Sequence, residues 1–318
     1  MNLKINLSLL LFGALFITAC QLANLKKTPG GMPYQIFSDA KQPKVKMGGF
    51  LKLAITQSIN DSVVFTNKGK IPNYIPVVNQ SFPYDISEIW SQLRLGDSVI
   101  ATQLIDTFMK RSPGGLPPSF KKGDRIITRV KVLAIFDNDN LRMIDADKEV
   151  EAFKKKEIEE VAAYVKKNSA TATRTPNGVF VQILEPGTGN LIDSGKYVSV
   201  NYTGRTFDGK IFDSNVDTSF QHTEPLSFTV GAGQMIPGFD EGIRSFRPGA
   251  KGILYLPSMQ GYGPMGSNGI KGYEHLKFEI QILSVANKAP EAPPTSFPPP
   301  PTSPPPPTEG NKRKGSDK

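Results

Sequence analysis

The clearest pattern along the chain lies in its second half, where short apolar runs alternate with turns rich in Gly and Asp. Five such runs occupy residues 179–184, 197–202, 226–230, 252–256 and 276–283. The last run alternates strictly, with Phe278, Ile280 and Ile282 on one face. Strands of this length joined by tight turns predict an antiparallel sheet with one buried face.

A short helix is predicted between the third and fourth of these strands, over residues 237–246. Pro237 suits a first helical turn, where a backbone N–H is not needed. Phe239, Ile243 and Phe246 then share one face of the helix. One helix packed on one antiparallel sheet defines an α+β domain.

A longer helix is predicted before this domain, from about Asp145 to Asn168, with Asp145 or Asp147 as its N-cap. Its apolar stripe consists of Val150, Phe153, Ile158, Val161 and Val165. The charged residues between them are typical of a solvated face, and some can pair one turn apart. We interpret the segment as a connecting helix.

The segment from about Gly48 to Asn138 has the same order of elements as the later domain. Residues 63–67 match 210–214, residues 86–96 match 239–249, and residues 129–133 match 279–283. Alternation alone can match by chance between any two small antiparallel domains. Three matches in the same order nevertheless favour a duplication.

The N-terminus has the pattern of a secretory signal, with Lys4 followed by an apolar run, Leu7 to Ile17, that is too short to span a membrane. The residues Ile17-Thr18-Ala19-Cys20 resemble a bacterial lipobox, in which the cysteine is lipidated after cleavage. The only cysteine of the chain is Cys20, and two or three acyl chains suffice for stable anchoring. We predict lipidation at Cys20; an ordinary signal peptide with a chance cysteine is the alternative.

The C-terminal end holds eleven of the 27 prolines between Pro290 and Pro307. Such a segment favours an extended polyproline II conformation and cannot bury an apolar core. We interpret it as a spacer or a contact to the cell envelope, in preference to a ligand for a proline-recognising domain.

Composition excludes several kinds of site. A single cysteine cannot form a disulfide framework or a thiolate zinc site, and two histidines do not favour a metal centre built from imidazoles. The net charge of +9 is spread along the chain without a dense block of Lys and Arg, so no nucleic-acid partner is predicted. No phosphate-binding loop or nucleophile elbow is present.

Several sequence blocks of the later domain stand out together. They are Val200-Asn201-Tyr202-Thr203-Gly204, residues 208–214, residues 230–239, residues 256–263 and Leu276-Lys277-Phe278. In this order, over about Asn177 to Val285, they resemble the FKBP-type peptidyl-prolyl cis-trans isomerases. The resemblance implies an α+β fold with two FKBP-like domains, each an antiparallel sheet wrapped on a short helix, joined by a connecting helix. It also implies an isomerase that needs no cofactor and no metal.

The resemblance assigns roles to individual residues. Tyr202, Phe212 and Phe278 would form the walls of an aromatic cup, Phe239 its floor, Met235 and Ile236 its rim, and Ile270 would close it. The backbone N–H of Ile236 and the hydroxyl of Tyr262 would donate to substrate carbonyls. Asp213 would supply a polar edge near the imide carbonyl.

The later domain departs from the family pattern in three places. Phe239 stands where many members have tryptophan, and the loop from Asn215 to Glu224 is longer and holds no arginine to pair with Asp213. Ile270-Lys271-Gly272 replaces an Ile-Pro-Pro run, which puts the affinity for macrolide inhibitors in doubt.

The earlier copy departs much further from the family. Its sequence matches place Ile55, Thr66, Ile86 and Thr128 where the later domain has Tyr202, Asp213, Phe239 and Phe278. A cup without aromatic walls and a polar edge should not isomerise proline. We predict a catalytically silent domain that serves spacing, dimerisation or chain binding.

The sequence thus predicts a lipid-anchored isomerase of the bacterial cell envelope, at the outer membrane or on the periplasmic face. Its partners would be unfolded or proline-containing exported polypeptides and the membrane. The predicted segments are a signal peptide (1–19), a linker (20–44), the silent domain (45–138), the connecting helix (145–168), the isomerase domain (170–287) and the Pro-rich tail (288–318). The alternatives are a non-catalytic envelope chaperone and, less favoured, a structural linker whose tail contacts the cell wall.

Overall fold

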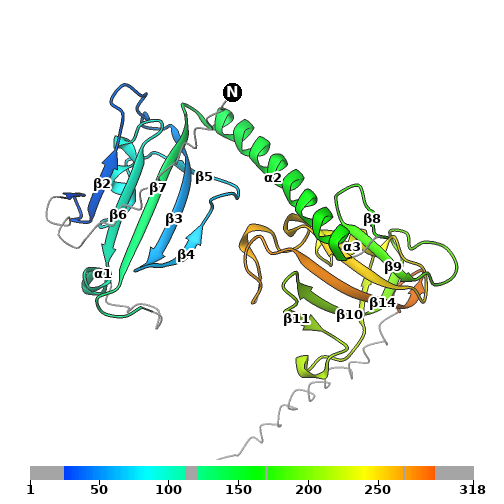
Figure 1. Cartoon of the computed structure of the whole chain (residues 1–318). Coiled ribbons are helices and arrows are strands. Elements are labelled where there is room, and N and C mark those ends of the chain that lie inside the picture. Colours follow the sequence, from blue (N-terminus) through cyan, green and yellow to red (C-terminus); the bar gives the residue numbers. More distant parts are fainter. Residues whose placement is uncertain (1–24, 112–119, 169–170, 268, 291–318) are drawn as a thin grey trace, which may run out of the picture. The chain divides into compact units, whose positions relative to one another are not determined.

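The computed structural model describes residues 25–111, 120–168, 171–267 and 269–290 (Figure 1). The predicted signal peptide, Cys20 and all but the first residues of the Pro-rich tail lie outside these ranges. The chain divides into two compact units, residues 1–160 and 161–318. Each unit contains one seven-stranded antiparallel sheet with short helices, which confirms the predicted α+β class.

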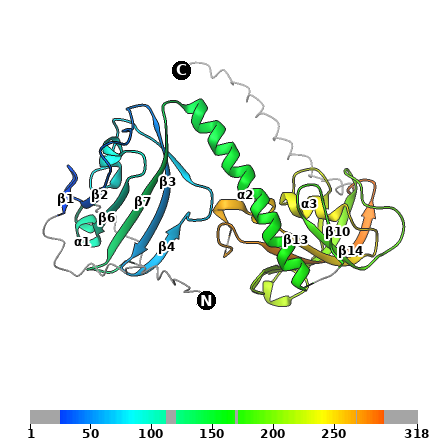
Figure 2. The same cartoon turned by 45° about the horizontal axis from the view of Figure 1, so that its top comes forward.

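The sheet of the first unit has the strand order β1-β2-β6-β7-β3-β4, with β5 also paired to β3. Its strands are β1 (Lys26–Lys27), β2 (Pro33–Phe37), β3 (Phe50–Ile59), β4 (Ser62–Thr66), β5 (Asn73–Pro76), β6 (Ser98–Leu104) and β7 (Arg125–Phe136). The helical segments are η2 (Ile86–Gln92) and α1 (Ile105–Arg111). Figure 2 shows β6, β7 and β3 side by side. Leu51, Leu53, Ile89 and Leu93 are fully buried in the core.

The sheet of the second unit has the order β11-β10-β14-β13-β9-β8, with β12 also paired to β10. Its strands are β8 (Thr173–Arg174), β9 (Phe180–Glu185), β10 (Tyr197–Thr206), β11 (Ile211–Ser214), β12 (Leu226–Thr229), β13 (Lys251–Leu256) and β14 (Leu276–Ala286). The helical segments are η3 (Thr218–Phe220), α3 (Pro237–Ile243), η4 (Ser258–Gln260) and η5 (Gly263–Met265). The five predicted strands and the short helix are all present. Pro237 starts α3 as expected, and Phe239 and Ile243 are buried against the sheet.

The two sheets have the same topology, strand by strand. Each strand of the first unit, from β1 to β7, takes the same place in its sheet as the corresponding strand of the second unit, from β8 to β14. Both long central pairs also shift register at the same point, between Lys52 and Leu53 and between Ser199 and Val200. The equal strand order and the shared register shift make Ile55 of the first unit equivalent to Tyr202 of the second.

A buried asparagine braces the central strand in both units. The Asn67 side chain accepts from the N–H of Ile55 at 2.7 Å and donates to the Leu53 carbonyl at 3.0 Å. Asn215 accepts from the N–H of Tyr202 at 2.7 Å and donates to the Val200 carbonyl at 3.0 Å. The same two strand positions are therefore held by an asparagine side chain in both units.

This pairing corrects the predicted match between the copies by one residue. If Asn67 is equivalent to Asn215, Thr66 is equivalent to Ser214 and not to Asp213. The hydroxyl contacts agree, because Thr66 and Ser214 each lie 2.9 Å from a threonine hydroxyl on the neighbouring strand. The residue of the first unit at the position of Asp213 is Phe65.

The long helix α2 (Asp139–Asn168) begins six residues before the predicted start. The side chain of Asn138 accepts from the N–H of Leu141 at 3.0 Å and caps the first turn. Asp145 and Asp147, the two expected caps, both lie inside the helix. The Asp145 carboxylate lies 2.7 Å from Lys52 Nζ and accepts a hydrogen bond from the Tyr74 hydroxyl at 2.6 Å. Its side chain is used in tertiary contacts, which periodicity cannot show.

Lys52 is 8% exposed and also meets Glu149 of α2 at 2.7 Å. Burial lowers the pKa of Lys52, but the hydrogen bonds to Asp145 and Glu149 outweigh it and raise the pKa above its ordinary value. Burial raises the pKa of Asp145, but the hydrogen bonds from Lys52 and Tyr74 outweigh burial and bring this pKa below its ordinary value. The cluster therefore attaches α2 to β3 as a charged network.

The last turns of α2 belong to the second unit. The ring of Tyr164 stacks on that of Phe207 with 3.9 Å between centroids, and its hydroxyl donates to the Phe207 carbonyl at 3.4 Å. Val161 and Val165 are buried. Each end of α2 is thus held by side-chain contacts of its own unit.

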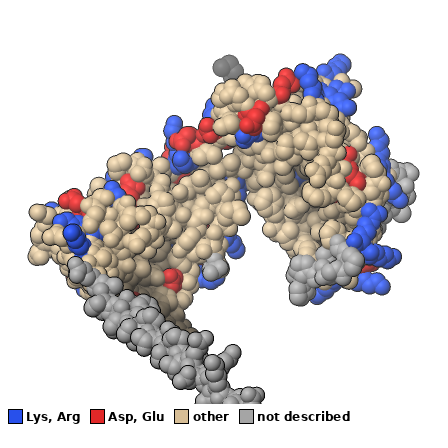
Figure 3. All heavy atoms as spheres, turned by 180° about the vertical axis from the view of Figure 1, so that it is seen from behind, with Lys and Arg blue, Asp and Glu red and all other residues tan. Residues whose placement is uncertain are grey.

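The first unit also includes part of the predicted linker, residues 20–44. Residues 26–27 and 33–37 of that segment form β1 and β2. Among the described residues, no helix is both long enough and apolar enough to cross a lipid bilayer. On the face that Figure 3 shows, Lys and Arg are scattered over the surface of each unit.

Candidate functional site

Four aromatic side chains from different elements of the second unit meet on one face of its sheet. Tyr202 is on β10, Phe212 on β11, Phe239 on α3 and Phe278 on β14. The ring of Phe278 lies at the centre of the group, 5.2 Å from Phe239, 5.6 Å from Phe212 and 6.4 Å from Tyr202 between centroids. The first two contacts are edge-to-face, the geometry that aromatic pairs favour.

Close approach of these rings depends on a glycine. Gly204 pairs with Phe278 across the sheet, and a Cβ atom at this position would lie 2.6 Å from the Phe212 ring and 3.0 Å from the Phe278 ring. The absence of a side chain therefore lets both rings pack over the strand. This close packing explains why the sequence block Val200 to Gly204 ends in a glycine.

The remaining predicted site residues surround this group. Met235 and Ile236 lie in the loop before α3 and pack against the core while partly exposed. Tyr262 is partly buried, with its ring 6.4 Å from that of Phe212. Ile270 is 8% exposed and belongs to the same apolar cluster. The structure thus places all nine predicted isomerase-site residues in one region.

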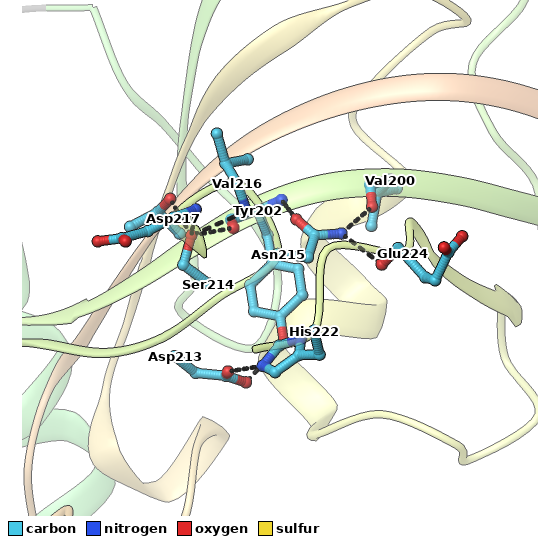
Figure 4. A network of polar contacts seen from close by, with 10 residues as sticks. Val200, Tyr202, Asp213, Ser214, Asn215, Val216, Asp217, His222 and Glu224 are labelled. Atoms are coloured by element: carbon cyan, nitrogen blue, oxygen red, sulfur yellow. Dashed lines mark hydrogen bonds and ion pairs between the residues drawn. The ribbon is translucent and has the colours of Figure 1, made fainter. Parts of the chain in front are cut away.

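The polar edge of the cup is a carboxylate with two partners. The Tyr202 hydroxyl donates to Asp213 Oδ2 at 2.6 Å, and His222 Nε2 lies 2.7 Å from Asp213 Oδ1 (Figure 4). Burial and the hydrogen bond to Asp213 raise the pKa of Tyr202 above its ordinary range. Burial, with the nearby charge of Asp213, also raises the pKa of Tyr262. Both tyrosines therefore keep their protons near neutral pH.

His222 corrects an expectation from the sequence. The loop from Asn215 to Glu224 contains no arginine, so the sequence predicts that Asp213 lacks its usual partner. The structure shows that the same loop returns a histidine to the carboxylate. The signal was available as a histidine nine positions after Asp213, but only the path of the loop brings the two together.

The equivalent positions of the first unit present different chemistry. Phe65 replaces the carboxylate, and Thr128 replaces the central ring of Phe278. The position of Gly204 is taken by Gln57, whose side chain donates to the Thr128 hydroxyl at 3.3 Å. A polar contact therefore stands where the second unit packs aromatic rings.

No cluster of three or more potential metal ligands occurs among the described residues. The groups present at this site are packed aromatic rings, one carboxylate with a tyrosine and a histidine partner, and further hydrogen-bond donors. Such a site can bind a planar or twisted apolar group and orient its carbonyls.

Comparison with known proteins gives this fold and site a family. The family model of the FKBP-type peptidyl-prolyl cis-trans isomerase matches residues 189–283, within the second unit. The FK506-binding protein of Neisseria meningitidis serogroup B is 38% identical over 109 residues, which cover 34% of this chain and 96% of that protein. The FKBP-type peptidyl-prolyl cis-trans isomerase FkpA of Aeromonas hydrophila is 33% identical over 199 residues, 62% of this chain and 68% of the relative.

Among solved structures, FkpA from Escherichia coli is 29% identical, with 48% of this chain and 70% of that chain covered and a TM-score of 0.35. The sequence relatives show the class of the protein. This chain belongs to the FKBP-type peptidyl-prolyl cis-trans isomerases.

Proposed function

We propose that the second unit isomerises X-Pro bonds of exported polypeptides in the cup formed by Tyr202, Phe212, Phe239 and Phe278. The observation that carries this proposal is the convergence of four aromatic rings around one carboxylate. In the proposed assignment Met235, Ile236 and Ile270 border the bound proline, and the Ile236 N–H and Tyr262 hydroxyl donate to substrate carbonyls.

The reaction needs no reactive group. Rotation about the imide bond faces a barrier of about 18–20 kcal/mol, because amide resonance is lost on twisting. An enzyme lowers it by binding the twisted imide more tightly than either planar isomer. The twisted imide is less dipolar, so a dry aromatic cup favours it over the planar forms, and Asp213 interacts with the imide carbonyl group.

The test is the rate of X-Pro exchange in an Ala-x-Pro-Phe peptide, measured with the full chain. The variant Phe212→Ala plus Tyr262→Phe removes one wall and one donor, and we expect its kcat/KM to approach the uncatalysed background. Leu184→Ala plus Tyr197→Phe removes one large apolar side chain and one tyrosine hydroxyl outside the cup, and should leave the rate unchanged. An intact rate in the first variant would contradict the site assignment.

We also infer that the first unit is a duplicate of the second that has lost catalysis. The shared strand order, the shared register shift and the paired asparagines support a common origin. The loss of the carboxylate and of the central ring supports the loss of activity. The double variant Phe212→Ala plus Tyr262→Phe, called the cup variant below, tests this inference. If the first unit were active, this variant would keep a measurable isomerase rate.

Chain binding is the use of the first unit that its surface favours. On the edge strand β4 the side chains of Val63 and Val64 are 61% and 57% exposed, and Phe82 is 70% exposed. Exposed apolar residues that lie together, as Val63, Val64 and Phe65 do along β4, are typical of contact sites. Suppression of the aggregation of an unfolded model protein by the inactive cup variant, weakened by Val64→Ser and Phe82→Ser, would support this role; equal suppression by all variants would contradict it.

We propose that the chain acts at the cell envelope, attached through lipidated Cys20. The signal pattern and the position of the only cysteine support this location. The same family relation makes FK506-type macrolides candidate ligands of the cup. Detergent phase partition of the chain after expression in bacteria, with and without Cys20→Ser, tests the anchor: equal partition of both forms would contradict it.

A further inference from the structure

The polar edge of the cup includes a residue outside the family blocks. We propose that His222 is a positioning residue for isomerisation, which holds Asp213 at the edge of the cup and makes the activity depend on pH near neutrality. This proposal rests on the proposed catalysis by the second unit. His222 need not touch the substrate, because it acts through the carboxylate.

The geometry gives the carboxylate two separate partners. His222 Nε2 lies 2.7 Å from Oδ1, and the Tyr202 hydroxyl donates to Oδ2 at 2.6 Å. Figure 4 shows the Asp213 carboxylate beside the His222 imidazole, with the hydroxyl end of the Tyr202 ring close by. Because both carboxylate oxygens of Asp213 have a partner, the carboxylate cannot rotate about its Cβ–Cγ bond without losing a hydrogen bond. Removal of the imidazole would leave Asp213 held by Tyr202 alone.

The loop itself delivers the imidazole to this point. Asp217 caps η3 by accepting from the N–H of Ser219 at 3.0 Å. Gln221 then adopts a left-handed conformation, with φ of 59°, and turns the chain. The side chain of Asn215 donates to the Glu224 carbonyl at 3.2 Å and holds the far end of the loop. Two hydrogen bonds and one left-handed turn, none of which involves the imidazole, therefore shape the segment that carries it.

The chemistry of the partner predicts a pH effect. Histidine changes its charge near pH ~6.5, within the range where few other side chains titrate. An imidazolium forms a charge-assisted hydrogen bond to a carboxylate, which is roughly twice as strong as a bond between neutral groups. The hold on Asp213 should therefore weaken as the pH rises and the imidazole loses its charge.

Two phenols also lie near this carboxylate, and neither changes its charge in that range. Tyr202 reaches it from β10, and Tyr262 faces it from the segment between η4 and η5. Both phenols have a raised pKa, so they stay neutral. We therefore expect kcat/KM of the unaltered chain to fall about two- to fivefold between pH 5.5 and pH 8.

The activity test compares variants of the full chain by exchange spectroscopy on an X-Pro peptide, which works at every pH in this range. His222→Ala should lower kcat/KM about three- to tenfold at pH 5.5 and remove the pH dependence. His222→Arg supplies a permanent cation and should restore the rate without pH dependence. Thr223→Ala changes the next exposed residue of the loop and should behave like the unaltered chain.

Two outcomes would overturn the proposal. One is a rate of His222→Ala within twofold of the unaltered chain at all pH values. The other is an unchanged pH dependence in His222→Ala, which would assign that dependence to a group other than His222.

A readout without turnover separates this proposal from the proposed function. The Nε2 resonance of His222 in the nitrogen NMR spectrum should move in Asp213→Asn and stay in place in Asp193→Asn, an exposed aspartate in another turn. Movement in the first variant with no isomerase activity in any form would contradict the catalytic assignment alone. No movement would overturn the positioning role of His222.

Discussion

The first and second units have sheets of the same topology and differ in the side chains that these sheets carry. Both keep seven strands in one order, the register shift in the central pair and the buried asparagine that braces two strand positions. They differ at the positions of the cup, where Ile55, Phe65 and Thr128 replace Tyr202, Asp213 and Phe278. The fold therefore depends on backbone pairing and one amide side chain, whereas the proposed chemistry depends on residues that the fold does not need.

The largest expected effect comes from exchanging these residues. The triple variant Tyr202→Ile, Asp213→Phe, Phe278→Thr gives the second unit the side chains of the first. We expect a loss of kcat/KM of about 1,000-fold, or ~4 kcal/mol of transition-state stabilisation, with the circular dichroism spectrum retained. The measurement is X-Pro exchange. A rate above one tenth of that of the unaltered chain would contradict the claim that catalysis depends on these three side chains.

The reverse exchange, which places the side chains of the second unit in the first, tests whether these residues are sufficient for catalysis. Ile55→Tyr, Phe65→Asp and Thr128→Phe should not create activity in the first unit of a chain whose second cup is inactive. Gln57 would still occupy the position of Gly204, and the loop that carries His222 would still be absent. A gain of activity would show that three side chains are sufficient.

The second prediction concerns what the units have in common. Asn67→Ala and Asn215→Ala each leave buried strand groups without partners, which costs about 2–3 kcal/mol. Each variant should destabilise its own unit in denaturant unfolding, and Asn215→Ala alone should also lower the isomerase rate. Conversely, equal rate losses in both variants would mean that catalysis depends on the first unit.

The third prediction tests the glycine under the aromatic rings. Gly204→Ala places a methyl group against Phe212 and Phe278, and we expect about a tenfold loss of kcat/KM, or ~1.4 kcal/mol. Gln57→Ala at the equivalent position of the first unit should leave the rate unchanged. An active Gly204→Ala variant would show that the rings can move apart without harm.

The smallest effect is a difference in acid stability. The position of Lys52 is taken by Ser199 in the second unit, which therefore lacks this charged attachment. Because the pKa of Asp145 is lowered in the folded state, its contribution is present above the pKa of the unfolded chain, ~3.9, and is lost as the pH falls through the lower folded value.

Calorimetry of the full chain between pH 6 and pH 3 checks this difference. The first unit should lose about 1 kcal/mol more than the second over this interval. In Lys52→Met the pH dependence of the first unit should shrink. If the first unit of Lys52→Met shows the dependence of the unaltered chain, the charged network does not stabilise it.

Much of the second unit could be predicted from the sequence because its signals are local. Alternation in residues 276–283 and Pro237 before an apolar face identify a strand and a helix without reference to other segments. The cup residues could be named only through family resemblance, since an aromatic residue that lines a site and one that fills a core look alike in a sequence.

The errors arose where tertiary contacts decide. Asp145 looks like a helix cap but pairs with Lys52, 93 positions earlier, and β1 and β2 are too short to stand out from a linker. The match between Thr66 and Asp213 failed by one residue because the true marker, Asn67, is polar and buried. His222 was missed because a loop path is not encoded in periodicity.

The buried asparagine also has an evolutionary consequence. Asn67 and Val77 are ten positions apart, whereas their equivalents Asn215 and Val230 are fifteen apart. All five additional residues therefore fall after the anchoring amide, in the segment that contains His222. A chain secured at that amide can lengthen beyond it without disturbing the sheet, so this segment is where the scaffold can accept new sequence and acquire new recognition at little cost to folding.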